Sequence, residues 1–135
     1  MLKLDYAILG ITLVSACATT AVKPNEAKLR LMPFAKYREP SPTKNAKLIV
    51  VRDSGFYGSD CTVEISLDGE KVTDLQEKEK IEFNLEPKQY VLDSKLGGAA
   101  CGGNLTGELE ILLASKQTAI IRVKLDEPML LKVNE

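Results

Sequence analysis

The feature that most constrains this chain is a strict alternation of apolar and polar residues. Residues 61–68 read CTVEISLD, in which every second side chain from Cys61 to Leu67 is apolar. A period of two places those side chains on one face of a β-strand. Asp68 and Gly69 follow, and glycine tolerates the positive φ of the tight turns that join hairpin strands. The pattern therefore predicts a hairpin, with residues 71–75 as the return strand.

The same kind of pattern recurs along most of the chain. Short apolar or alternating runs lie at residues 48–51, 81–85, 90–92, 109–113, 119–125 and 129–133. In the last run, Met129, Leu131 and Val133 are expected to share one face. Seven or eight short strands at this spacing favour an all-β fold, an antiparallel β-sandwich of immunoglobulin-like or transthyretin-like type. We assign this domain to residues 46–135.

Composition argues against several classes of function. Lys and Arg total 18 against 19 Asp and Glu, so the chain lacks the basic excess typical of nucleic-acid binding. It contains no His, the commonest general acid–base and metal ligand. Glu64, Glu82 and Glu110 occupy polar positions of alternating strands, as solvated side chains do. We expect no enzyme, no cofactor and no metal, although a glycosidase-like carboxylate pair from distant segments stays open.

The first residues differ from the rest of the chain. Lys3 precedes an apolar run at residues 6–14, which is shorter than the roughly 20 residues that span a bilayer. The run ends in the segment LVSAC at residues 13–17. This segment resembles the lipobox of bacterial lipoproteins, in which an apolar residue and two small residues precede the cysteine that receives lipid. The resemblance implies a signal peptide at residues 1–16 and an acylated Cys17.

Acylation would attach the mature chain to a membrane. Several acyl chains together make such an anchor effectively permanent. Ala18 rather than Asp follows the cysteine, which implies, by the resemblance, sorting to the periplasmic face of the outer membrane. Two other interpretations of the first twenty residues remain: a buried N-terminal element of the fold, and a leader cleaved elsewhere by an ordinary signal peptidase.

Residues 17–45 are unsuited to long regular elements. Four of the six prolines lie here, at positions 24, 33, 40 and 42, and proline lacks the backbone N–H that such elements need. We expect a flexible tether between the lipid and the domain. The alternative is a docking segment, because Leu29, Leu31, Met32 and Phe34 are apolar for a linker.

Two cysteines, Cys61 and Cys101, remain once Cys17 is assigned to lipid. An exported pair in an oxidising compartment favours a disulfide. Free buried thiols are one alternative. A metal site is another, although no His or third Cys is left to complete a zinc shell. The glycines at residues 97–103 would give Cys101 freedom to reach Cys61, and they lack the pattern of a phosphate-binding loop.

The segment at residues 52–60 reads RDSGFYGSD and is the most distinctive of the predicted domain. As an exposed loop it would present Arg52, Phe56 and Tyr57 as a recognition site, since loops on a rigid scaffold often carry function. The plainer interpretation is a connection between two strands. The loop also suggests a second hypothesis for function: a periplasmic inhibitor that inserts this loop into the active site of a hydrolase such as lysozyme.

Several motifs within residues 46–125 together resemble the domain-of-unknown-function family 2846, a group of small bacterial lipoproteins. They are LIVVR at residues 48–52, GFYG at 55–58, LDGEKV at 67–72, Leu75, residues 79–83 and PKQYVL at 87–92. Lys88 stands where that pattern usually has glycine. The resemblance implies an envelope-facing β-sandwich and brings no catalytic residues. We therefore expect a lipid-anchored, non-catalytic binding or structural module, with the membrane as one partner and an envelope protein or peptidoglycan as another.

Overall fold

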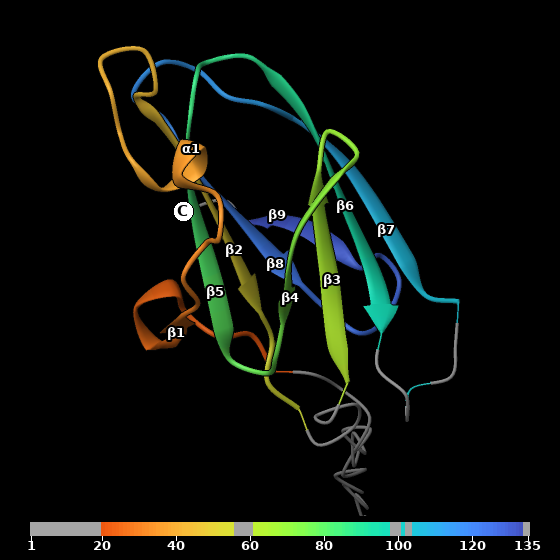
Figure 1. Ribbon diagram of the computed structural model, residues 1–135. Helices are drawn as coiled ribbons and strands as arrows, with labels where there is room; N and C mark the ends of the chain where they lie inside the picture. The colour runs from red at the N-terminus through yellow and green to blue at the C-terminus, as the bar shows by residue number, and fades with distance from the viewer. Residues whose placement is uncertain (1–19, 56–60, 98–100, 102–103, 134–135) are drawn as a thin grey trace, which may run out of the picture.

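Alternating apolar residues form the strands of a β-sandwich, as the sequence predicts (Figure 1). The computed structural model describes residues 20–55, 61–97, 101 and 104–133. A 3₁₀-helix at Pro24–Glu26 precedes the first strand, and a single helical turn, α1 (Ala35–Arg38), lies between the first two strands. The described residues form nine strands: β1 (Lys28–Leu29), β2 (Ala46–Arg52), β3 (Thr62–Leu67), β4 (Glu70–Leu75), β5 (Glu79–Leu85), β6 (Gln89–Gly97), β7 (Thr106–Leu112), β8 (Thr118–Val123) and β9 (Leu130–Val133).

The strands divide into two sheets. The four-stranded sheet has the order β4-β3-β6-β7 and is antiparallel throughout. The five-stranded sheet has the order β1-β5-β2-β8-β9 and contains two parallel pairs, β1–β5 and β2–β8. The seven or eight strands expected in residues 46–135 are confirmed as the eight strands β2 to β9 of the described residues. The preceding segment adds β1, and two of the strand pairings are parallel where only antiparallel ones were expected. Alternation does not reveal strand direction, because side chains alternate between faces in both kinds of sheet.

The core lies between the two sheets. In β3, the apolar positions Val63, Ile65 and Leu67 are at most 1% exposed, while the residues between them are partly accessible. The five-stranded sheet contributes its own buried set: Leu48, Val50, Ile81, Phe83 and Ile121. Burial of each such side chain contributes about 1.5–3 kcal/mol. The alternation read from the sequence therefore identifies most of the core.

The predicted hairpin turn joins β3 to β4. Asp68 has φ of 49° and Gly69 has φ of 82°, as a two-residue type I′ turn requires. The Asp68 carboxylate accepts a hydrogen bond from the Val91 N–H at 2.8 Å. The turn is thereby fixed to the neighbouring strand β6 as well as to its own hairpin.

The flexible tether expected at residues 17–45 needs correction, because much of its described part packs on the sandwich. β1 pairs with β5, and Met32 is 2% exposed within the core. The Tyr37 ring contacts Phe83 edge-on, with ring centroids 5.3 Å apart. α1 packs against β5, at the left of Figure 1. Prolines prevent long regular elements, but they do not prevent irregular backbone from covering the open edge of a sandwich.

The expected faces of the last strand also need correction. Met129 and Leu130 are 1% and 5% exposed, whereas Leu131 is 40% exposed. Met129 precedes β9, so the in–out alternation of that strand begins only at Leu130. Leu131 pairs with Arg122 and lies with it on the outer face of the five-stranded sheet.

Candidate functional site

The predicted site residues fall into two groups. Cys17, Phe56 and Tyr57 lie outside the described residues. Cys61 and Cys101 form a disulfide, as predicted, with their Cα atoms 5.7 Å apart. The bond joins the start of β3 to the connection between β6 and β7. We call this end of the sandwich the disulfide end, and the Asp68–Gly69 turn lies at the opposite end.

The sequence suggested that Arg52 is an exposed recognition residue, and this prediction is wrong. It is 1% exposed at the end of β2. Its Nη1 donates hydrogen bonds to the carbonyl oxygens of Cys61 and Leu75, the latter at 2.8 Å. Burial lowers the pKa of this guanidinium, since the charged form loses hydration. Cys61 directly precedes β3 and Leu75 ends β4, and both strands belong to the four-stranded sheet. Arg52 therefore joins the two sheets and is unavailable to a partner.

Asp53 forms an ion pair that the sequence did not indicate. Its side chain is 1% exposed, and it accepts hydrogen bonds from Arg122 Nε at 2.7 and 2.9 Å and from Nη2 at 2.7 Å. These bonds raise the pKa of the Arg122 guanidinium. The pair fixes the end of β2 to β8. The two residues meet because β2 and β8 are parallel neighbours. Alternation in the sequence does not reveal which strands are neighbours, so it could not predict this pair.

The N-terminal segment joins the fold beside this ion pair. The Thr20 N–H donates to the Ser54 carbonyl at 2.6 Å, and the Ser54 N–H donates to the Thr20 carbonyl at 3.0 Å. Residues 21–24 then line a cleft of about 140 Å³ together with Val51, Ile120, Arg122 and Val133. The chain thus reaches the sandwich at the disulfide end and continues across the five-stranded sheet.

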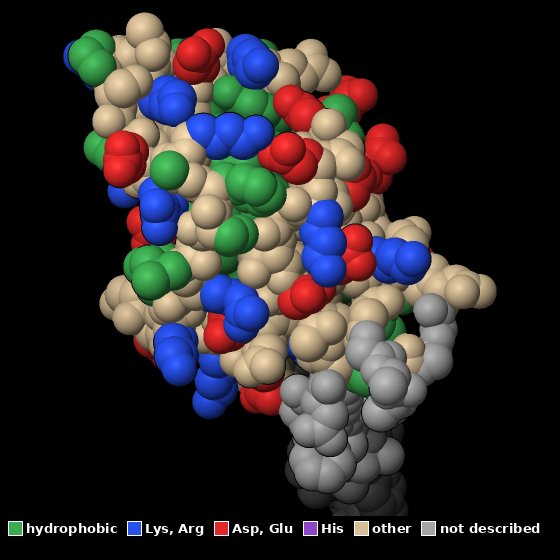
Figure 2. All heavy atoms as spheres, viewed as in Figure 1, with side chains coloured by type: hydrophobic (Ala, Val, Ile, Leu, Met, Phe, Trp, Pro, Cys, Tyr) green, Lys and Arg blue, Asp and Glu red, His purple; other side chains and the backbone are tan. Residues whose placement is uncertain are grey.

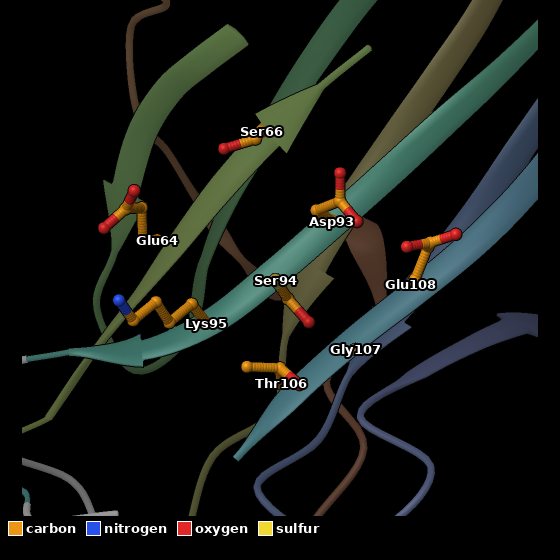
Figure 3. A pocket seen from close by; sticks show the side chains of 8 residues that line it. All are labelled: Glu64, Ser66, Asp93, Ser94, Lys95, Thr106, Gly107 and Glu108. Atoms are coloured by element: carbon orange, nitrogen blue, oxygen red, sulfur yellow. The ribbon is translucent and has the colours of Figure 1, made fainter. Parts of the chain in front are cut away.

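A second hollow, of about 330 Å³, lies on the four-stranded sheet (Figure 3). The strand register places Glu64 opposite Lys95, and Asp93 opposite Glu108. Opposite charges paired across strands are stabilising, and like charges are not. The hollow can therefore offer hydrogen bonds and negative charge to a partner. Three neighbouring strands supply its lining: Glu64, Ser66, Asp93, Ser94, Lys95, Thr106, Gly107 and Glu108.

Ser94 and Gly107 belong to the interior face of the same sheet. Ser94 is 2% exposed, and its Oγ has no hydrogen-bond partner in the described part of the chain. Gly107 pairs with Ser94, and a Cβ at this glycine would lie 2.6 Å from that Oγ and 2.8 Å from the Cβ of Met129. Glycine is required here because these groups approach too closely for a side chain. Ser94 alternates with Asp93 and Lys95, so its hydroxyl faces the core.

Two further observations bear on the class of site. Within the described ranges, no group of three or more His, Cys, Asp or Glu side chains is arranged to hold a metal ion. No helix in that same part of the chain combines the length and the apolar character needed to cross a membrane.

No protein-family model matches the chain, and no curated protein matches its sequence. The resemblance to family 2846 therefore stays a prediction.

Proposed function

We propose that this chain is a lipid-anchored, non-catalytic binding or structural module of the bacterial cell envelope, attached through Cys17 to the periplasmic face of the outer membrane. The position of Cys17 carries the proposal. It ends the lipobox-like segment LVSAC, and Thr20, three residues later, is hydrogen-bonded to Ser54 of the sandwich.

The short distance in sequence between Cys17 and Thr20 supports a domain held close to the membrane. Three residues span at most about 10 Å when fully extended. A lipid on Cys17 would therefore keep the disulfide end within that distance of the headgroups. This differs from a long tether, which would let the domain search for partners far from the membrane.

The disulfide supports export from the cytoplasm. Disulfides persist in the periplasm and are rare in reducing compartments. Cys61 and Cys101 are joined at the same end of the sandwich as Thr20. The bond would strengthen the end of the domain that the lipid anchor restrains.

A binding role is supported by the way the domain uses its charged groups. Arg52 and Asp53 are buried and hold strand ends together. The exposed hollow of the four-stranded sheet offers carboxylates, hydroxyls and the Lys95 ammonium. Such groups suit polar contacts with an envelope protein or with peptidoglycan.

Intact mass spectrometry of the protein expressed in a bacterial host tests the proposal, with Cys17→Ala as the control. We expect a mature chain that begins at Cys17 and carries the added mass of acyl chains. The Cys17→Ala chain should lack that mass and should leave the membrane fraction. An unprocessed chain, or one cleaved elsewhere without lipid, would refute the proposal.

A further inference from the structure

We propose that the outer face of the five-stranded sheet lies against the lipid bilayer. This inference rests on the Cys17 anchor proposed above, and it adds which surface of the domain contacts the lipid. The supporting features are an apolar outer face, a difference in charge between the two sheets, and the path of the N-terminal segment.

The strand register defines the outer face of this sheet. Side chains of directly paired residues lie on the same face, and Lys80 and Glu82 alternate with the buried Ile81 and Phe83 of β5. One row across the sheet is Leu29, Lys80, Val51, Arg122 and Leu131. The next row is Glu82, Ile49, Ile120 and Val133. A third row, Asn84, Lys47 and Thr118, is polar. Six of these twelve side chains are apolar, and of those six Val51 is only 2% exposed, whereas a solvated sheet face is ordinarily polar.

Exposed leucines lie at both edges of this face, beside β1 and on β9. Leu29 is 49% exposed, Leu31 is 74% exposed and Leu131 is 40% exposed. Leu31 lines a shallow depression with Leu29 and Glu82, which places it over the same sheet. The remaining strongly exposed large apolar side chain of the described residues is Leu112, on the other sheet. Apolar side chains gathered on one face of a soluble domain indicate a contact surface.

Charge distinguishes the two sheets. On the five-stranded sheet, Lys47 and Lys80 both lie within 3.6 Å of Glu82, so the two cations share one carboxylate. The charged outer positions in the registers of β3, β6 and β7 are mainly acidic: Glu64, Asp93, Glu108 and Glu110, with Lys95 among them. Acidic side chains gather over β6 and β7 in Figure 2. An anionic lipid surface attracts the first face and repels the second.

The N-terminal segment leads toward this same face. Residues 21–24 line a cleft together with Val51, Ile120 and Val133, three of its outer positions. Thr20 is fixed to Ser54, and Cys17 is three residues further along. The anchor would therefore hold the disulfide end of this face within about 10 Å of the bilayer. Few exposed leucines suffice for the contact, because the lipid chains already hold the protein at the membrane.

Fluorescence quenching on vesicles tests this orientation. The full lipidated protein is reconstituted in vesicles of phosphatidylethanolamine and phosphatidylglycerol that contain a headgroup-labelled quencher lipid. One probe is attached at Thr118→Cys, an exposed outer position of the five-stranded sheet far from the disulfide end. The matched probe is at Thr106→Cys, an exposed outer position of the four-stranded sheet near the disulfide end.

We expect several-fold stronger quenching at the Thr118 probe than at the Thr106 probe. The double change Leu31→Ser and Leu131→Ser should remove this difference. Leu112→Ser should not, although Leu112, on the other sheet, is 70% exposed, close to the 74% of Leu31. Equal quenching, or stronger quenching at Thr106, would overturn the inference, since a domain standing on its disulfide end brings Thr106 closer to lipid. Dimers that the double change dissociates, with no quenching at Thr118, would assign the face to a second copy. Failure to float with vesicles would overturn the anchor itself, and this inference with it.

Discussion

Removal of the disulfide should destabilise the domain strongly. Cys61 and Cys101 are 40 residues apart, and the loop that they close contains β3 to β6. For a loop of this length, the chain-entropy treatment gives about 4 kcal/mol of stabilisation, through restriction of the unfolded chain. Domains of this kind are stable by about 5–15 kcal/mol. The cross-link therefore supplies a quarter or more of the expected free energy of unfolding.

Denaturant unfolding followed by circular dichroism measures this effect. The comparison uses Cys17→Ala protein in both arms, so that no third thiol can exchange, with and without the further changes Cys61→Ala and Cys101→Ala. The circular dichroism spectrum of the folded protein should be unchanged by the two further changes. The denaturant concentration at the midpoint of unfolding should fall. Reduced Cys17→Ala protein keeps both side chains and separates the cross-link from their packing. If the free energies of unfolding of the oxidised, reduced and alanine forms agree within about 1 kcal/mol, the entropy argument is refuted.

Three further changes test the interior and the ion pair. Gly107→Ala should lower the free energy of unfolding by about 1–3 kcal/mol, because its Cβ would lie 2.6 Å from Ser94 Oγ. In urea unfolding, the further change Ser94→Ala should restore part of that loss. Asp53→Asn should lower the free energy of unfolding by about 1–3 kcal/mol in the same assay. This loss is smaller than that expected on breaking a fully buried ion pair, because the Arg122 side chain is 25% exposed. Unchanged stability would contradict the assigned pair. Burial raises the pKa of the Tyr90 hydroxyl to about 12, so the folded state holds this proton more tightly than the unfolded chain does. Stability should be full below about pH 10 and should fall as the pH rises toward about 12; absorbance titration and alkaline unfolding measure this, and Tyr90→Phe should remove that part of the fall.

Much of the fold follows from the sequence because it depends on local rules. Alternation at residues 61–67 reports burial of one strand face, and Asp68-Gly69 adopts the turn that its backbone freedom favours. The same local reasoning misplaced Leu131, because the strand begins one residue after Met129. The apolar outer face also had a local signal, since Ile49 and Ile120 stand where alternation would place polar residues.

The candidate site could be predicted only in part. The pairing of Cys61 with Cys101 follows from their number and from the expected export. The role of Arg52 does not follow, because nothing local shows that the carbonyls of Cys61 and Leu75 lie within reach of its guanidinium. The Asp53–Arg122 pair is hidden for the same reason, since it depends on which strands are neighbours.

The sequence by itself determined an all-β chain, the positions of most strands, the hairpin turn and the larger part of the core. These depend on the period of two and on backbone preferences that act over a few residues. Only the tertiary structure decided the parallel β2–β8 pair, the packing of Met32 and Tyr37 over the sandwich edge, and the burial of Arg52. Each of these depends on contacts between segments distant in the chain, and such contacts leave no mark in the local pattern of residues.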